Sequence, residues 1–468
     1  MTNDVRIEHD LLGERPVPAD VYWGIHTLRA LENFPITGKP IGSYADLVKA
    51  LALVKLAAAH ANRQLGDLDE RRFDVITRAC QEILTGKWHD QFVVDVIQGG
   101  AGTSTNMNAN EVIANRALEL LGAPKGDYDV VHPINHVNMS QSTNDVYPTA
   151  LRVAACFGIQ GLIATMAELR TAFSAKAEEF ADILKIGRTQ LQDAVPMTLG
   201  QEFSTYAVMI GEDEARLAEA VLLIQEVNLG ATAIGTGINT DIGYARLAIE
   251  HLSAISGLPL VPAPNMIEAT QDTGAFVQLS GVLKRVAAKL SKICSDLRLL
   301  SSGPQGGFNE IKLPERAAGS SIMPGKINPI IPEVVNQIAF EVIGNDVTIT
   351  MASEAGQLQL NAFEPIIGHS LFKSIEHLKA GCLTLAHNCV TGITANRALL
   401  AERARTSAGL ATALNPYIGY ENATRVAREA LRSGRAVADI VAELGLLDRE
   451  ALAAILRPDV LTAPRRRH

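Results

Sequence analysis

Long runs of apolar residues with the spacing of buried helices dominate the middle of the chain. These runs span Thr149–Glu179, Leu199–Leu229, Ala275–Leu300 and Pro332–Ser353. They exceed the usual length of globular helices, and their apolar residues cover more than one face. A helix that is apolar on every face has to be buried, and one subunit cannot bury several of them side by side. The pattern therefore predicts a helical bundle that packs against further copies of the same chain.

The same pattern divides the chain into three parts, as expected for 468 residues, which exceed a single core. Residues 1–142 mix short helices, such as one over Tyr44–Leu65, with loops rich in Gly, Pro and Asn. Residues 143–395 hold the long apolar runs, and residues 396–468 return to short helices. We expect a mainly α protein with an N-terminal mixed helical domain, a central bundle domain and a small C-terminal helical domain.

Charge and cysteine usage restrict the partners and the compartment. The net charge is −9, so a nucleic-acid or anionic-membrane surface is not expected, and the one dense basic run is Arg465–Arg467. The five cysteines are scattered without a CxxC pair, which predicts reduced thiols in a cytoplasmic protein. The polar N-terminus does not resemble a signal peptide, and Val153–Ala167 is too short for a membrane span. We interpret that segment as a buried bundle helix.

The stretch Gly319–Pro329, GSSIMPGKINP, is the strongest functional signal. Gly and Pro interrupt it too often for a helix or a strand, so it is predicted to be a loop. Its serines, Lys326 and Asn328 would present hydroxyl and amide donors beside a fixed positive charge, which suits a carboxylate. A glycine-rich turn precedes the loop and an apolar run follows it, as is typical of an active-site lid.

Other motifs point away from nucleotides and metals. Gly235-Thr236-Gly237 lacks the third glycine of a dinucleotide-binding loop, and no GxxxxGK[ST] is present. His132 and His136 have a metal-like spacing, but Pro133 intervenes and no carboxylate motif accompanies them. Further hydroxyl and amide clusters do recur in predicted loops: Thr103-Ser104-Thr105, Ser142-Thr143-Asn144 and Thr189-Gln190. Taken singly, each cluster is more typical of a turn or a helix cap, where Ser, Thr and Asn are common.

The chain resembles the fumarase/aspartase superfamily in these loops and beyond them. The matching stretches are RIEHDLLGERPVPADVYWGIHTLRALENFPI (Arg6–Ile36), GTSTNMNANEVIANRALE (Gly102–Glu119), HVNMSQSTNDVYPTA (His136–Ala150), GRTQLQDAVPMTLGQEF (Gly187–Phe203), the Gly319–Pro329 loop and LNPYIGYENATRVA (Leu414–Ala427). They occur in the family's order over nearly the whole chain. Within the superfamily the pattern is most similar to that of the aspartases.

This resemblance implies a fold, an activity and a set of site residues. The fold is a tetramer with a core of helices from four chains and sites shared between chains, and no cofactor or metal is implied. The activity is reversible deamination of L-aspartate to fumarate and ammonia, with Ser320 as the base that removes the Cβ proton. The substrate-binding residues implied are Thr103, Ser142, Thr143 and the backbone of Ser321 for the β-carboxylate, Asn144 and Gln190 for the amino group, and Thr189, Lys326 and Asn328 for the α-carboxylate.

Two departures from the family pattern leave alternatives open. Gln190 stands where fumarases, and some aspartases, carry a histidine, and Thr143 stands where fumarases usually carry serine. Both residues favour amine chemistry over the addition of water. Ile134 and Asn135 replace the Asn-Asp of a segment reported to bind a second anion in relatives, so that secondary site is not expected. The alternatives are a fumarate hydratase, a lyase acting on a modified aspartate, and a non-catalytic helical structural protein.

Overall fold

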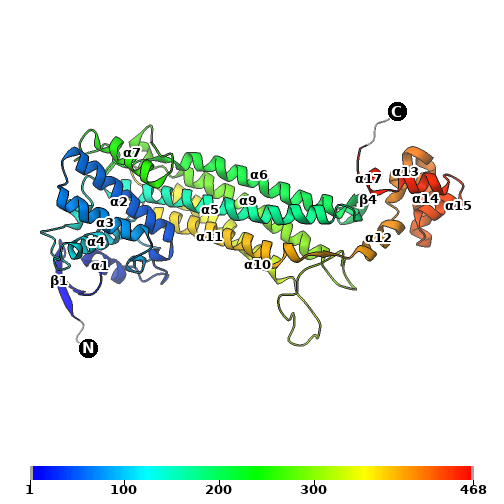
Figure 1. Ribbon diagram of the computed structural model, residues 1–468, viewed down its shortest axis with the longest axis horizontal. Helices are drawn as coiled ribbons and strands as arrows, with labels where there is room; N and C mark the ends of the chain where they lie inside the picture. The colour runs from blue at the N-terminus through cyan, green and yellow to red at the C-terminus, as the bar shows by residue number, and fades with distance from the viewer. Residues whose placement is uncertain (1–3, 465–468) are drawn as a thin grey trace. The chain divides into compact units, whose positions relative to one another are not determined.

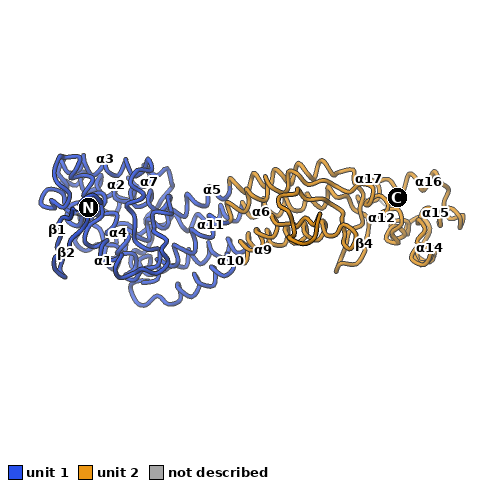
Figure 2. The backbone as a smooth tube through the Cα atoms, turned by 90° about the horizontal axis from the view of Figure 1, so that it is seen from below, with its two compact units in different colours: residues 1–163, 215–285, 341–377 blue, residues 164–214, 286–340, 378–468 orange. Residues whose placement is uncertain are grey.

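The computed structural model describes residues 4–464, and these residues form a mainly helical protein (Figure 1). The basic run Arg465–Arg467 lies outside the described residues. The chain divides into two compact units, which Figure 2 colours separately. Unit 1 comprises residues 1–163, 215–285 and 341–377, and unit 2 comprises residues 164–214, 286–340 and 378–468. The division into three domains expected from the sequence stays a prediction.

The long helices contribute residues to both units. They are α5 (Thr143–Glu179), α6 (Leu199–Ile224), α9 (Gly274–Leu300), α10 (Ile330–Glu354) and α11 (Glu364–Asn388). The predicted runs for α5, α9 and α10 are confirmed to within a few residues. The predicted end of α6 at Leu229 is wrong, because Glu226–Val227 leaves the helix and pairs in parallel with Val261–Pro262. Helix α11 is missing from the sequence prediction, since Gly, His and Ser interrupt its apolar positions.

Helix α5 is long and apolar enough to cross a membrane, but it is a core helix. Within its most apolar window, 67% of the residues are buried inside the protein. Val153, Ala154 and Leu162 are fully buried. The interpretation of this segment as a buried bundle helix is therefore confirmed, and its apolar character reflects packing against protein.

Unit 1 packs several shorter elements against helix α4 (Thr103–Leu120). Helix α2 packs against both α3 and α7, and α3 packs against α4. The elements are β1 (Val5–Asp10), β2 (Gly13–Pro18), α1 (Ile25–Asn33), α2 (Ala45–Leu65), α3 (Glu70–Leu84), α4 (Thr103–Leu120), β5 (Glu226–Val227), α7 (Tyr244–Ser256), β6 (Val261–Pro262) and α8 (Met266–Ala269). The predicted Tyr44–Leu65 helix is confirmed as α2. The antiparallel hairpin of β1 and β2 is absent from the sequence prediction.

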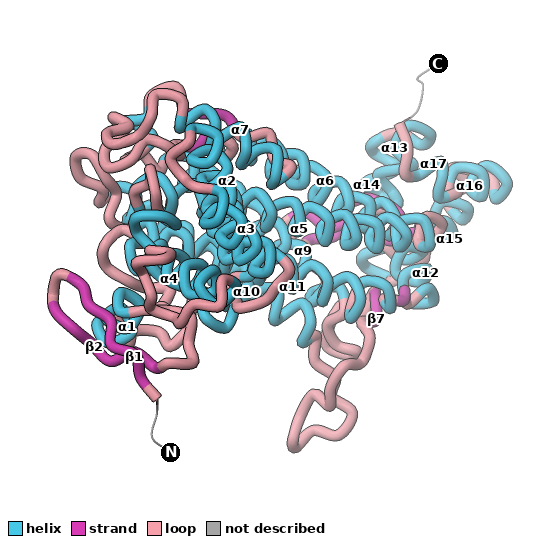
Figure 3. Tube along the Cα trace, turned by 60° about the vertical axis from the view of Figure 1, so that its left-hand side comes forward, coloured by secondary structure: helices cyan, strands magenta, loops and turns pink. Residues whose placement is uncertain are grey.

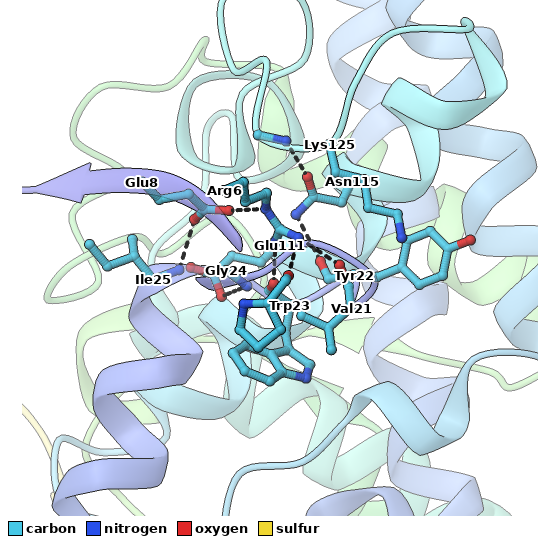
Figure 4. Close-up of polar contacts among 12 residues, drawn as sticks. Arg6, Glu8, Val21, Tyr22, Trp23, Gly24, Ile25, Glu111, Asn115 and Lys125 are labelled. Carbon is cyan, nitrogen blue, oxygen red and sulfur yellow. Dashed lines mark hydrogen bonds and ion pairs between the residues drawn. The ribbon is translucent and has the colours of Figure 1, made fainter. Parts of the chain in front are cut away.

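Two buried carboxylates from elsewhere in unit 1 cap helix α1, as Figure 4 shows. Gly24 precedes the helix and offers no capping side chain. Glu111 of α4 instead accepts hydrogen bonds from the backbone N–H groups of Gly24 and His26, both at 2.8 Å, and Glu8 accepts one from Ile25 at 2.8 Å. A negative charge is favourable at a helix N-terminus, so the two carboxylates tie the N-terminal hairpin and α1 to α4. A Cβ on Gly24 would lie 2.5 Å from Glu8 Oε2, so only glycine fits there.

Unit 2 contains a hairpin, a long loop and the C-terminal helices. The C-terminal helices share an apolar core that includes Leu414, Val426 and Val437, all fully buried. The elements are β3 (Leu184–Thr189), β4 (Gln192–Thr198), β7 (Ile311–Lys312), β8 (Thr394–Ala395), α12 (Arg397–Thr406), α13 (Leu410–Ile418), α14 (Tyr420–Ser433), α15 (Val437–Glu443), α16 (Arg449–Ile455) and α17 (Pro458–Leu461). The predicted loop over Gly319–Pro329 is confirmed: it connects β7 to α10 and is drawn without helix or strand in Figure 3.

Candidate active site

The first turn of α5 presents three of the predicted site residues, Ser142, Thr143 and Asn144. Ser142 Oγ accepts a hydrogen bond from the Asn144 N–H at 3.2 Å, and Asp145 accepts one from the Ser142 N–H at 2.9 Å. This reciprocal pattern is a capping box, which the sequence S-x-x-D already encodes. Burial raises the pKa of Asp145 to about 6, although its backbone hydrogen bonds act in the opposite direction.

The side chain of Asn144 is held in one orientation. Pro148 has no N–H to bond the Asn144 carbonyl four residues earlier, and Asn228 Nδ2 donates to that carbonyl instead, at 3.1 Å. Asn144 Nδ2 donates to the Ala233 carbonyl at 2.7 Å. Its Oδ1 therefore faces away from that carbonyl and remains an available acceptor, which suits a bound ammonium group.

Thr103 begins helix α4, and the start of this helix lies against the first turns of α5. A Cβ on Gly102, which has a φ of +88°, would lie 2.3 Å from the ring of Tyr147. Only glycine allows this approach. The exposed Thr103 donates its hydroxyl hydrogen to the Gly100 carbonyl at 2.8 Å, so it must turn to hold a carboxylate. The N-termini of α4 and α5 both place positive partial charge at this end of unit 1, which favours an anion.

A buried polar network lies behind Thr143 and is missing from the sequence prediction. Lys55 of α2 is fully buried, and its Nζ donates to the side-chain oxygens of Asn106, Asn138 and Gln141. Asn106 Nδ2 in turn donates to Thr143 Oγ1 at 3.0 Å. Two signals were available: a lysine within the apolar run of α2, and asparagines within α4, where asparagine is a poor helix former.

In unit 2, Thr189 and Gln190 lie at the tip of the β3–β4 hairpin. Gln190 and Leu191 form its two-residue turn with φ values of +54° and +61°. Left-handed conformations at two consecutive non-glycine residues are strained, and such strain is common at functional sites. All three residues are exposed. Arg188, next to the tip, is anchored by Glu310 at 2.6 Å, so a rigid base supports an exposed end.

Ser320 lies in the Gly319–Pro329 loop, where backbone donors surround its hydroxyl. Ser320 Oγ accepts hydrogen bonds from the N–H groups of Ile322 at 3.2 Å and Met323 at 3.0 Å. Donors placed in this way favour a negatively charged oxygen over a neutral one. The loop is half-buried at Ser320 and exposed over the following residues.

The base of this loop is closed by its other predicted site residues. The Gly319 N–H donates to the Lys326 carbonyl at 2.8 Å, and Asn328 Nδ2 donates to the Gly319 carbonyl at 2.6 Å. The side chains of Ser321 and Lys326 are exposed. The loop thus presents a serine oxygen, a cation and an amide within one closed backbone turn.

The histidine pair His132 and His136 is engaged with backbone. His132 Nδ1 accepts from the Ile134 N–H at 3.0 Å, and His136 Nδ1 accepts from the His132 N–H at 2.8 Å. Within residues 4–464, no group of three or more His, Cys, Asp or Glu side chains has an arrangement that could hold a metal. His132 caps a π-helical turn, Pro133–Val137, and His136 lies within that turn.

Each unit therefore brings together part of the predicted residue set. Unit 1 places Thr103 and the Ser142–Asn144 turn at adjoining helix N-termini. Unit 2 carries the Ser320 loop and, separately, the Thr189-Gln190 hairpin tip. The first set offers hydroxyl and amide groups, and the second offers a lysine and a serine oxygen that accepts two backbone hydrogen bonds.

Family models match most of the chain. A model described as "Lyase" covers residues 13–344, and one described as "Fumarase C C-terminus" covers residues 410–463. Aspartate ammonia-lyase from Pseudomonas aeruginosa is 61% identical over 98% of this chain and 97% of its own length. The corresponding enzyme from Escherichia coli K12 is 52% identical over 99% of this chain and 97% of its own length.

Solved structures agree with these matches. A fumarate lyase:delta crystallin from Brucella melitensis, in a form bound to cobalt, superimposes with a TM-score of 0.96 at 54% identity, covering 98% of this chain and 100% of its own. A class II fumarase from Schistosoma mansoni gives a TM-score of 0.90 at 34% identity, covering 97% of this chain and 98% of its own.

The family models and the relatives identify this helical protein as a lyase. The chain belongs to the fumarase/aspartase family and, within it, to the aspartate ammonia-lyases, which are carbon–nitrogen lyases.

Proposed function

We propose that the protein converts L-aspartate reversibly to fumarate and ammonia, with Ser320 as the base that removes the Cβ proton. The observation that carries the proposal is the pair of backbone N–H groups directed at Ser320 Oγ. A hydrogen bond to a charged group contributes about 1.5–3 kcal/mol, so two of them offset a large part of the cost of forming an alkoxide. No cofactor takes part in this mechanism.

The intermediate is an aci-carboxylate, in which the β-carboxylate carries two negative oxygens. Hydroxyl donors and helix N-termini stabilise this charge as it develops. We assign Thr103, Ser142, Thr143 and the backbone of Ser321 to the β-carboxylate, and Thr189, Lys326 and Asn328 to the α-carboxylate. Asn144 and Gln190 contact the amino group through their carbonyl oxygens, and the bond from Asn144 Nδ2 to Ala233 supports this orientation for Asn144.

Substrate choice tests this proposal against its main alternative, a fumarate hydratase. Separate samples of folded protein receive L-aspartate or L-malate at mildly alkaline pH, and fumarate absorbance reports turnover. We expect kcat/KM to be far higher for aspartate, because Asn144 Oδ1 is an acceptor that an ammonium satisfies with a donor. Malate turnover equal to or above that of aspartate would reject the proposal in favour of the hydratase.

We further propose a cytoplasmic homotetramer whose active sites combine residues from different chains. Support comes from α10, where Phe340, Ile343, Val347 and Met351 recur at helical spacing and are 63%, 36%, 56% and 67% exposed. A stripe of this kind on a long helix is typical of a surface covered by another subunit. The exposed hairpin tip at Gln190 likewise suits a residue that completes a neighbour's site.

Mixing two inactive variants tests the sharing of sites. Ser320→Ala and Thr189→Ala are unfolded together and refolded, and each variant refolded alone is the control. If the two residues reach one site from different chains, random mixing leaves about a quarter of the sites without either lesion, and activity returns. If tetramers that demonstrably contain both variants remain inactive, one chain contributes both residues to the same active site.

A further inference from the structure

The buried ammonium of Lys55 fixes the orientation of three amide side chains. Its Nζ lies 2.7 Å from Asn106 Oδ1, 2.8 Å from Asn138 Oδ1 and 2.9 Å from Gln141 Oε1. An ammonium has three N–H donors and no acceptor, so each donor requires an oxygen. If any one of these amides turned over, its own N–H₂ would face the ammonium in a fully buried site. The surroundings of Lys55 thus match its protonated form.

The orientation of the Asn106 amide determines which of its two polar groups faces Thr143. With Oδ1 directed at Lys55, Asn106 Nδ2 donates to Thr143 Oγ1 at 3.0 Å and to Asn138 Oδ1 at 3.1 Å. Thr143 Oγ1 is therefore an acceptor in this contact. Its own hydrogen has to point elsewhere, and within residues 4–464 Thr143 Oγ1 donates no hydrogen bond to another residue. The Thr143 hydroxyl can therefore donate its hydrogen to a bound ligand.

We propose that Lys55 and Asn106 are positioning residues that hold the Thr143 hydroxyl as a donor for the substrate carboxylate. The proposal rests on the proposed function, in which this group is the β-carboxylate of aspartate. Without the relay, the Thr143 hydroxyl could donate inward to an acceptor at position 106, and the carboxylate would lose one hydrogen bond. The positive charge of Lys55 sits behind the same hydroxyl and favours binding of an anion in front of it.

Nearby negative charge supports the protonated form of Lys55, whereas burial opposes it. Burial lowers the pKa of the Lys55 ammonium to about 7, and the neighbouring carboxylate of Asp145 acts in the opposite direction. A carboxylate bound at Thr143 adds a second negative charge nearby, which also favours the protonated lysine. A purely structural cluster is the competing explanation, and it predicts that changes at Asn106 and Thr143 act independently.

A double-mutant cycle separates the two explanations. Asn106→Asp keeps an oxygen for Lys55 but replaces the donor to Thr143 with an acceptor, which turns the hydroxyl inward. Thr143→Val removes the hydroxyl with little change in shape. Each variant alone is expected to lower kcat/KM by about 10- to 150-fold, the range for one hydrogen bond to a charged group. The double variant is expected to match Thr143→Val alone, because Asn106 acts only through that hydroxyl.

The matched control is Asn110→Asp on the same helix. Asn110 also donates to Asn138 Oδ1, at 3.1 Å, and the substitution adds the same charge, but Asn110 has no hydrogen bond to Thr143. Its effect is expected to multiply with that of Thr143→Val. If the effects of Asn106→Asp and Thr143→Val also multiply, in variants whose Tm shows a folded protein, the relay is wrong.

The lysine itself provides a second variant. Lys55→Met is expected to lower kcat/KM in the wild-type background and to have little effect in the Thr143→Val background, while an equal effect in both would overturn the proposal. If Lys55→Met does not fold, the double-mutant cycle of Asn106→Asp and Thr143→Val decides between the two explanations. All rates are read with whichever of L-aspartate or L-malate the wild type converts. A wild type that converts L-malate instead of L-aspartate would show that the substrate assignment is wrong. Independent effects of the substitutions would show that the relay is absent.

Discussion

Gly319→Ala tests whether the closed base of the serine loop is required for activity. A Cβ at this position would lie 2.1 Å from the Lys326 carbonyl oxygen, 2.7 Å from its carbon and 2.9 Å from the Asn328 nitrogen. All three are backbone atoms, so no flexible side chain can move aside, and the loop has to open. The opening breaks the bonds from the Gly319 N–H to Lys326 and from Asn328 Nδ2 to the Gly319 carbonyl.

The size of the effect follows from these two bonds. Each contributes about 0.5–1.5 kcal/mol, so losing both makes closure about 2 kcal/mol less favourable and lowers the ratio of closed to open loop about 30-fold. We expect kcat/KM for aspartate, followed by fumarate absorbance, to fall by at least that factor. The Tm should change little, because the loop is exposed and opens locally without unfolding the core.

Gly325→Ala is the matched control within the same loop. Gly325 has a φ of +79°, and a Cβ there would meet nothing within 4 Å. Its cost is therefore the left-handed backbone alone, about 1 kcal/mol, which corresponds to about a fivefold loss. Equal losses in the two variants, or an unchanged kcat/KM in Gly319→Ala, would refute the role assigned to the closed base.

Two further predictions concern specificity and acid stability. Gln190→His introduces the residue that fumarases carry. We expect lower aspartate turnover without a gain of efficient malate dehydration. Steady-state kinetics with both substrates checks this, and a clean switch to malate would contradict it. His60 stacks on His251 at 5.2 Å, and burial together with the charge of His251 lowers the pKa of His60. The unfolded chain therefore binds protons more readily just below pH 6.5, so stability should fall with acidification. His60→Phe should flatten this fall in a series of Tm values from pH 7 to pH 5, and an unchanged slope would reject the assignment.

The sequence predicts those features that depend on local pattern. Gly and Pro mark the Gly319–Pro329 loop, and long, mainly apolar runs mark α5, α9 and α10. Helix α11 has the same length as α10, but Gly368, His369 and Ser370 break its pattern, and only packing against other helices makes it evident. The end of α6 depends on pairing with a segment far along the chain, which no local signal encodes.

The candidate site also has parts that local sequence patterns predict and parts that they do not predict. Its hydroxyl and amide residues lie in short motifs that sequence comparison finds directly. The supporting contacts come from elements remote in sequence: Asn228 bonds the Asn144 backbone, and Lys55 reaches Thr143 through Asn106. Such contacts require α2, α4 and α5 to be packed, so local sequence patterns do not predict them.

Turnover of L-aspartate by the Ser320→Ala variant is the most direct test of the account. Wild type and variant are compared by fumarate absorbance without added cofactor, with circular dichroism and Tm confirming that both are folded. We predict rapid fumarate formation by the wild type and a kcat about 10²- to 10⁴-fold lower in the variant, because the base is lost while the binding groups remain. A folded variant that retains kcat within about tenfold of the wild type would contradict the assignment of Ser320 as the base.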